Sequence, residues 1–139
     1  MIRFRAIDIA LPVMDTDRVR YWIESVITGS GFRVGELCYY FCSDEELLRI
    51  NQERLGHDFY TDIVTFPLGD CKEYISSEFC ISVDRIAENC INFGRSFESE
   101  LLRVMIHGVL HLTGFDDLTE NDREKMRSKE EECLNIYYK

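Results

Sequence analysis

The sequence lacks the long apolar runs that mark export or membrane insertion. Residues 1–11 carry Arg3, Arg5 and Asp8 among their apolar positions, so this stretch has no unbroken apolar core of a signal peptide. No stretch approaches the roughly 20 apolar residues that a membrane span needs. We therefore expect a soluble, cytoplasmic protein with no membrane partner.

The sequence also lacks any Cys-x-x-Cys pair, although it contains six cysteines. The spacing of these cysteines matches no zinc-ribbon pattern. In a chain that is not secreted, such residues are most often small buried hydrophobes that stay reduced. We expect that role for all six, which are Cys38, Cys42, Cys71, Cys80, Cys90 and Cys133.

Basic residues are in the minority, because 16 Lys and Arg stand against 26 Asp and Glu, for a net charge of −10. This balance counts against a nucleic-acid ligand, since phosphate binding relies on Lys and Arg. Such a ligand is compatible with the sequence only if basic residues cluster locally in the fold. Arginine supplies most of the cations, and arginine suits phosphate recognition better than lysine does.

Repeats, linkers and low-complexity tracts are missing as well, so the 139 residues predict one domain, residues 1–139. Hydrophobic residues make up 45% of the chain, which is enough to form a core. Strand and helix patterns are interspersed. They predict an α+β fold with one small, mostly four-stranded sheet and about five helices. The predicted strands are residues 2–9, 35–42, 62–67 and 79–83, and the first predicted helix is 15–28.

Capping signals predict where the other helices begin. Ser43 with Glu46 three residues later matches a capping box, and that helix is expected to end near residue 54. Asp84, Ser96 and Thr119 are expected to cap the next three helices. The helix after Ser96 is apolar nearly all round as far as residue 112, so we expect it to be buried.

The most informative segment is residues 105–117. His107 and His111 are four residues apart on the predicted buried helix, so both imidazoles face the same side and can share one ion. Gly114 follows where a helix commonly ends in a left-handed turn. That turn lets the chain double back and deliver a third ligand. We predict Asp117 for this role, with Asp116 as the competitor.

The two histidines could instead be ordinary core residues or a surface pair. The chain has only three histidines, however, and two of them stand four apart in its most apolar helix. Burying unpaired imidazoles is costly, so a shared ion is the simpler explanation. Two imidazoles and a carboxylate leave one position open, as in catalytic zinc sites. We therefore predict one Zn²⁺ per chain, although another divalent transition metal is compatible.

The spacing His-x3-His-x2-Gly-x2-Asp also matches the helix of metzincin-type proteases. Those enzymes need a glutamate directly after the first histidine to act as general base. This chain has Gly108 at that position. The sequence therefore argues against peptide hydrolysis by that mechanism.

Two blocks of the sequence resemble the YbeY family of metal-dependent endoribonucleases. His107-Gly-Val-Leu-His-Leu-Thr-Gly-Phe-Asp116 is similar to the family signature. Asn51, Asp58 and then Thr61-Asp-Ile-Val-Thr-Phe-Pro67 resemble a second family block. Length and element order fit over nearly the whole chain.

This resemblance implies a single-strand-specific endoribonuclease. It implies action in maturation of the 3′ end of small-subunit ribosomal RNA and in ribosome quality control. The expected partners are single-stranded RNA, ribosomal RNA and the ribosome, and no DNA is expected. The family's zinc ligands include two histidines that match His107 and His111.

The chain departs from the family at two functional positions. The family usually has a third histidine where this chain has Asp117, and two-His-one-carboxylate sites also suit Fe(II), Co(II) or Ni(II). A family arginine falls on Leu55, so the adjacent Arg54 is a candidate catalytic residue that would stabilise phosphate charge. His57 is a candidate general base, but an exposed loop histidine is the simpler interpretation.

Two other functions remain open from the sequence. One is a different zinc metallohydrolase, such as a metzincin-like protease with an unusual base. The other is a non-enzymatic ribosome-assembly factor with a structural metal. Structural zinc sites usually have four protein ligands, so an open fourth position argues against the second alternative.

Overall fold

The fold is built on a four-stranded sheet in the order β1-β2-β4-β3, and the computed structural model describes all residues 1–139. Strands β1, β2 and β4 run parallel, whereas β3 runs antiparallel to β4 and forms an edge. The strands are β1 (Ile2–Ala6), β2 (Arg33–Cys42), β3 (Ile63–Pro67) and β4 (Tyr74–Ser82). The helices are α1 (Thr16–Gly29), α2 (Asp44–Leu55), α3 (Val83–Asn92), α4 (Phe97–Leu112) and α5 (Glu120–Tyr137). The predicted α+β class is confirmed.

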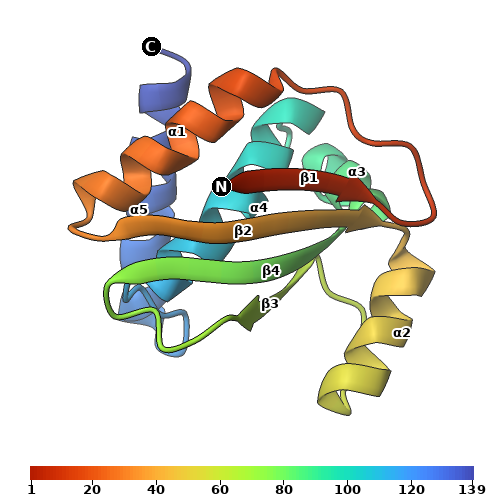
Figure 1. Cartoon of the computed structure of the whole chain (residues 1–139). Coiled ribbons are helices and arrows are strands. Elements are labelled where there is room, and N and C mark those ends of the chain that lie inside the picture. The colour runs from red at the N-terminus through yellow and green to blue at the C-terminus, as the bar shows by residue number, and fades with distance from the viewer.

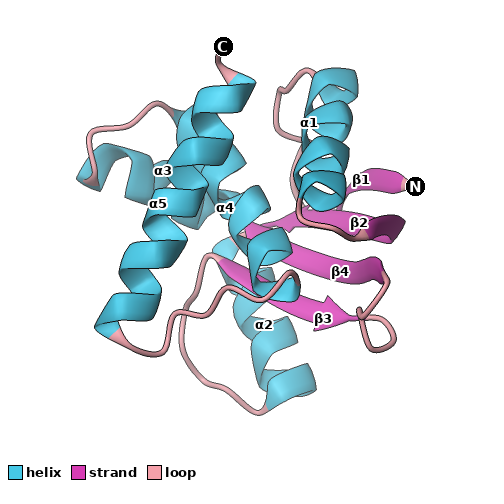
Figure 2. Cartoon of the chain, turned by 90° about the vertical axis from the view of Figure 1, so that its left-hand side faces the viewer, coloured by secondary structure: helices cyan, strands magenta, loops and turns pink.

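The two faces of the sheet are covered unequally. In Figures 1 and 2, α2 stands apart from the other four helices, which group together. Side chains alternate between the faces of a strand, so Leu37, Tyr39 and Phe41 of β2 share one face. All three belong to a cluster of 25 buried residues that also includes residues of α1, α4 and α5. Helix α4, which carries His107 and His111, is therefore held within the main core.

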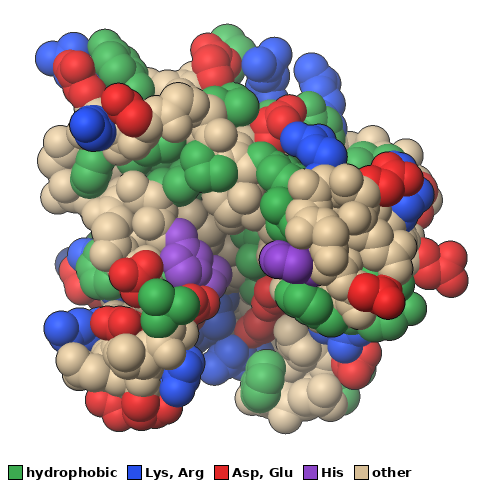
Figure 3. Space-filling model, turned by 90° about the horizontal axis from the view of Figure 1, so that it is seen from below, with side chains coloured by type: hydrophobic (Ala, Val, Ile, Leu, Met, Phe, Trp, Pro, Cys, Tyr) green, Lys and Arg blue, Asp and Glu red, His purple; other side chains and the backbone are tan.

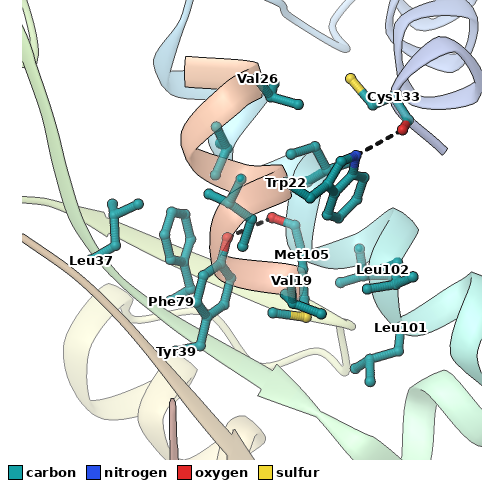
Figure 4. Packing of buried hydrophobic residues seen from close by; sticks show 14 of the residues in the cluster. Val19, Trp22, Val26, Leu37, Tyr39, Phe79, Leu101, Leu102, Met105 and Cys133 are labelled. Carbon is teal, nitrogen blue, oxygen red and sulfur yellow. Dashed lines mark hydrogen bonds between the residues drawn. The ribbon is translucent and has the colours of Figure 1, made fainter. Parts of the chain in front are cut away.

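Buried polar groups fix how the helices sit on this core (Figure 4). The hydroxyl of Tyr39 donates to the carbonyl of Met105 at 2.9 Å, which ties β2 to α4. The indole nitrogen of Trp22 donates to the carbonyl of Cys133 at 2.8 Å, which ties α1 to α5. Each bond satisfies a donor that would be costly to bury alone.

The opposite face carries a small cluster of five buried residues beneath α2: Cys42, Leu47, Ile50, Val64 and Cys80. All six cysteines of the chain are free. Cys42, Cys80 and Cys133 are buried, and the other three are partly buried. Burial raises the pKa of Cys42 to about 12, so its thiol stays protonated at neutral pH. The predicted role as buried small hydrophobes therefore holds for Cys42, Cys80 and Cys133 and does not hold for Cys38, Cys71 and Cys90, which are only partly buried.

Three of the four predicted caps are confirmed. The hydroxyls of Ser43, Ser96 and Thr119 accept backbone N–H groups at the starts of α2, α4 and α5. The cap assigned to Asp84 is wrong, because Ser82 is the N-cap of α3. The Asp84 carboxylate accepts instead from the backbone N–H of Asp44, at the start of another helix.

Two strand boundaries differ from the prediction by three residues or more. β1 ends at Ala6 and not at residue 9, and β4 begins at Tyr74 and not at residue 79. The early part of β4 has a polar sequence, yet Ser77 is fully buried and its hydroxyl donates to the carbonyl of Phe66 at 3.0 Å. Pairing with both β2 and β3 keeps this polar segment extended. None of the helices is long and apolar enough to span a membrane.

Candidate metal centre

Helix α4 places His107 and His111 one turn apart, on a side of the helix that is partly exposed to solvent. Their side chains are 24% and 30% exposed, whereas most neighbouring residues of α4 are buried. The two Nε2 atoms lie 3.0 Å apart, and the rings meet edge to face at 86°. Both imidazoles therefore point at one spot, as their spacing predicted.

The turn after α4 returns the chain to this spot. Gly114 has a φ of 115°, which is favourable for glycine but strained for other residues. The N–H of Phe115 donates to the carbonyl of Leu110 at 3.0 Å and closes the turn. One carboxylate oxygen of Asp117 then lies 3.3 Å from Nε2 of His111 and 3.7 Å from Nε2 of His107.

The spacing of these three atoms fits a tetrahedral zinc site. Nitrogen and oxygen ligands about 2.0–2.1 Å from zinc at tetrahedral angles are about 3.3–3.4 Å from one another. The three observed separations, 3.0, 3.3 and 3.7 Å, fall around that value. No other group of three His, Cys, Asp or Glu side chains in the chain is arranged to share an ion.

The structure separates the two competing aspartates. Asp117 approaches both histidines, whereas Asp116 is exposed and contacts neither of them.

Figure 3 shows that the histidine-bearing face of the molecule is hollowed, with histidine side chains on both sides of the hollow and charged side chains beside them.

A buried carboxylate that the sequence analysis missed supports the first histidine. Nδ1 of His107 lies 2.6 Å from Oε2 of Glu130, whose side chain is only 7% exposed. A carboxylate can only accept, so Nδ1 carries the proton and Nε2 is left free for a metal. Arg103 in turn donates to Glu130 at 3.0 Å and to Glu131 at 2.6 Å. The sequence feature that could have indicated this role is the position of Glu130 on the apolar face of α5, four residues after Met126.

The charges around His107 favour a cation. Burial by itself would lower the pKa of His107, but the hydrogen bond to Glu130 and the charges of Glu130, Asp62 and Asp117 outweigh it and raise the pKa. Burial raises the pKa of Asp62, and the proximity of His107 offsets part of that rise. His107 thus lies against the carboxylates of Glu130 and Asp117 and is influenced by the charge of Asp62, a setting that favours a bound cation.

Gly108 has a packing role that explains its position. A Cβ atom there would lie 2.8 Å from the ring of Phe79 and 2.9 Å from Cδ1 of Ile63. The missing side chain lets α4 approach β3 and β4 closely. A glutamate at this position would point into the sheet and could not serve as a base beside the ion.

The two other candidate residues lie apart from the histidine pair. Arg54 stacks over the ring of Phe66 at 4.4 Å, and Phe66 packs on the cluster beneath α2. His57 is exposed and stacks on Phe59 with 5.1 Å between ring centroids. Neither residue contacts His107 or His111.

Comparison with known proteins gives the family. The family model "Endoribonuclease YbeY" matches residues 8–138. The chain belongs to the endoribonuclease YbeY family. A YbeY relative from Christiangramia forsetii is 43% identical, over 86% of this chain and 82% of its own length. A relative from Porphyromonas gingivalis is 41% identical, over 96% of this chain and 87% of its own.

The YbeY relative from Bacteroides thetaiotaomicron is 38% identical, over 96% of both chains. The fold agrees with the solution structure of TM1509 from Thermotoga maritima, with a TM-score of 0.69 and 26% identity. That match covers 99% of this chain and 89% of the other. Family membership and fold therefore extend over nearly the whole chain.

Proposed function

We propose that this chain is a metal-dependent endoribonuclease that cleaves single-stranded RNA at one Zn²⁺ held by His107, His111 and Asp117. One observation carries the proposal: three ligand atoms stand at zinc spacing in a member of the YbeY family. The relatives are named endoribonucleases, and a shared activity is the simplest expectation at this identity and coverage.

When bound, the ion would supply Lewis acidity toward a phosphoryl oxygen and toward water. The protein's part is to hold the donors rigidly. Glu130 fixes the tautomer and orientation of His107, and Arg103 holds Glu130 in place by pairing with it. The partial exposure of the three ligands leaves one side of the site open to a polynucleotide. Arg54 is the candidate for contact with a substrate phosphate.

The biological setting is proposed from family membership. The substrate in the cell would be ribosomal RNA, with cleavage near the 3′ end of the small-subunit RNA and a role in ribosome quality control. The ribosome would be the partner and the cytoplasm the location.

Specific features disfavour the two alternative functions. The protease alternative needs a base beside the ion, and the packing of Gly108 against Phe79 leaves no room for one at the usual position. A structural metal site would normally have four protein ligands, and only three donors converge here.

Metal-dependent cleavage of a short single-stranded RNA tests the proposal. We expect the purified protein to cut this RNA, a chelator to stop the reaction and added Zn²⁺ to restore it. The matched duplex and casein should remain intact. Cleavage that persists with chelator, or in a variant carrying His107→Ala and His111→Ala, would mean that another nuclease or another site is responsible.

A further inference from the structure

The loop between α2 and β3, residues 56–62, exposes two large aromatic rings side by side in sequence. Phe59 is 55% exposed and Tyr60 is 53% exposed. Exposing two adjacent rings forgoes the free energy that burying them would give. Their exposure therefore points to a ligand that contacts rings.

The last turn of α2 holds this loop in place. The side-chain amide of Asn51, which is 1% exposed, donates to the carbonyl of Phe59 at 3.1 Å. The amide of Gln52 donates to the carboxylate of Asp58 at 2.5 Å, and the N–H of His57 donates to the carbonyl of Asn51 at 3.2 Å. The rings are thus presented on a fixed backbone, which lowers the entropy lost on binding.

The loop leads directly into the metal site. Asp62 lies close enough to His107 for the charge of each to act on the other. Cδ1 of Ile63 reaches the space beside Gly108, the residue next to His107. Three residues of extended chain span about 10 Å, so Tyr60 stands within that reach of Ile63. The hollow in Figure 3 lies on this histidine-bearing face.

Two arginines accompany this loop despite the acidic composition: Arg54 precedes it at the end of α2, and Arg85 lies near the ring of Tyr60. Arg54, in the last turn of α2, forms no ion pair with any carboxylate and lies 4.4 Å over Phe66 of β3. Arg85 lies 5.5 Å from the ring centre of Tyr60, although Asp44 partly neutralises it at 2.8 Å. Arg54 is therefore the cation here that is free to meet a phosphate.

We propose that Phe59 and Tyr60 form a stacking surface for unpaired bases of the RNA beside the cleaved linkage, with Arg54 contacting a phosphate. The inference rests on the proposed endoribonuclease function and adds residues that select the substrate. Only unpaired bases present free faces to aromatic rings, so this surface favours single strands over duplexes. Stacking is uncharged, which lets a protein of net charge −10 hold RNA with few phosphate contacts.

Steady-state cleavage of a short single-stranded RNA by the zinc-loaded protein tests this surface. The double variant Phe59→Ala with Tyr60→Ala should raise KM by roughly tenfold or more, since each stacked base contributes severalfold or more to affinity. The kcat and the metal content should stay unchanged. Arg54→Ala should instead lower the slope of log KM against log salt by about 0.7, the value for one phosphate contact on a single strand.

Tyr74→Ala is the matched control. Tyr74 is 48% exposed and lies beneath Arg33 at 5.9 Å, much as Tyr60 lies beneath Arg85, but on β4 away from the loop. The KM of the Tyr74→Ala variant should equal that of the unaltered protein.

Two results are distinguishable. If the unaltered protein cuts RNA in a metal-dependent way but the double variant keeps the same KM and the same preference for single strands, the stacking surface is wrong. The exposed rings would then have to serve a protein contact. If the unaltered protein cuts no RNA at all, the proposed function itself fails.

Discussion

Two regions meet at the candidate site and are built in different ways. In the α4–α5 region, the candidate metal ligands are supported by buried charged side chains. Glu130 contacts both His107 and Arg103. The α2–β3 loop exposes Phe59 and Tyr60 and is fastened by hydrogen bonds to the end of α2 and, at Asp62, to the end of β4. Metal geometry needs a rigid, enclosed support, whereas a polynucleotide needs an accessible surface. We therefore expect metal affinity and RNA affinity to be separable by mutation.

The largest separation should come from removing both histidines. The variant with His107→Ala and His111→Ala should lose the single bound ion and all metal-dependent cleavage, because only one donor of the three remains. Its affinity for single-stranded RNA, measured by fluorescence anisotropy, should change only a few fold, since the loop is intact. Full metal content by elemental analysis would show that the ion is bound elsewhere.

The pair of neighbouring aspartates gives the next largest contrast. Asp117→Ala should weaken metal binding by more than the roughly 10–100-fold expected for loss of a supporting group. Asp116→Ala should leave it nearly unchanged, because Asp116 contacts neither histidine. Asp117→His, which supplies an imidazole in place of the carboxylate, should retain the ion. Loss of metal in the Asp116 variant alone would reassign the third ligand.

Replacing Glu130 tests the support of His107. Glu130→Gln keeps an acceptor for Nδ1 but removes the charge that makes the imidazole a stronger donor. We expect metal affinity, measured by competition with a chelating dye, to fall roughly 10–100-fold. Glu131→Gln is the control, because Glu131 pairs with Arg103 at 2.6 Å but does not touch His107. Equal metal affinity in the two variants would contradict a specific role for Glu130.

The smallest expected effect concerns stability and not binding. Gly108→Ala places a methyl group 2.8 Å from Phe79, so α4 or the ring must move, at a cost of about 1–3 kcal/mol in the free energy of unfolding. Gly29→Ala, at the end of α1, has no atom within 4 Å of the new methyl group and should be nearly neutral. Urea unfolding of both variants measures the difference, and an unaffected Gly108→Ala midpoint would mean that the close approach carries no constraint.

The features that could be predicted from the sequence are those formed by residues close together along the chain. The spacing of His107 and His111 is a property of one helix, and the left-handed residue Gly114 made the return of Asp117 predictable. Caps at Ser43, Ser96 and Thr119 depend on neighbours three residues away, so they too were predicted.

The parts that were missed depend on contacts between distant segments. The bond between His107 and Glu130 joins residues on two different helices that are 23 positions apart along the chain. The side of β3 on which Arg54 packs depends on which face of the sheet α2 covers. The spacing of residues in the sequence does not reveal that face. The prediction of a cap at Asp84 was wrong for a related reason. The Asp84 carboxylate accepts a hydrogen bond at the start of α2, 40 residues earlier.

The close spacing of the metal-site residues along the chain has a consequence for folding. All three candidate ligands and Glu130 come from residues 107–130, whereas β1 pairs Ile2 with Leu37 and β2 pairs Leu37 with Ser77. Longer loops close more slowly and at greater entropic cost, so assembly of the parallel sheet should limit the folding rate. An ion that binds only the finished site would then slow unfolding and leave refolding unchanged. Stopped-flow refolding with and without Zn²⁺ should give the same rate, and faster refolding with the ion would show that the helix pair forms first.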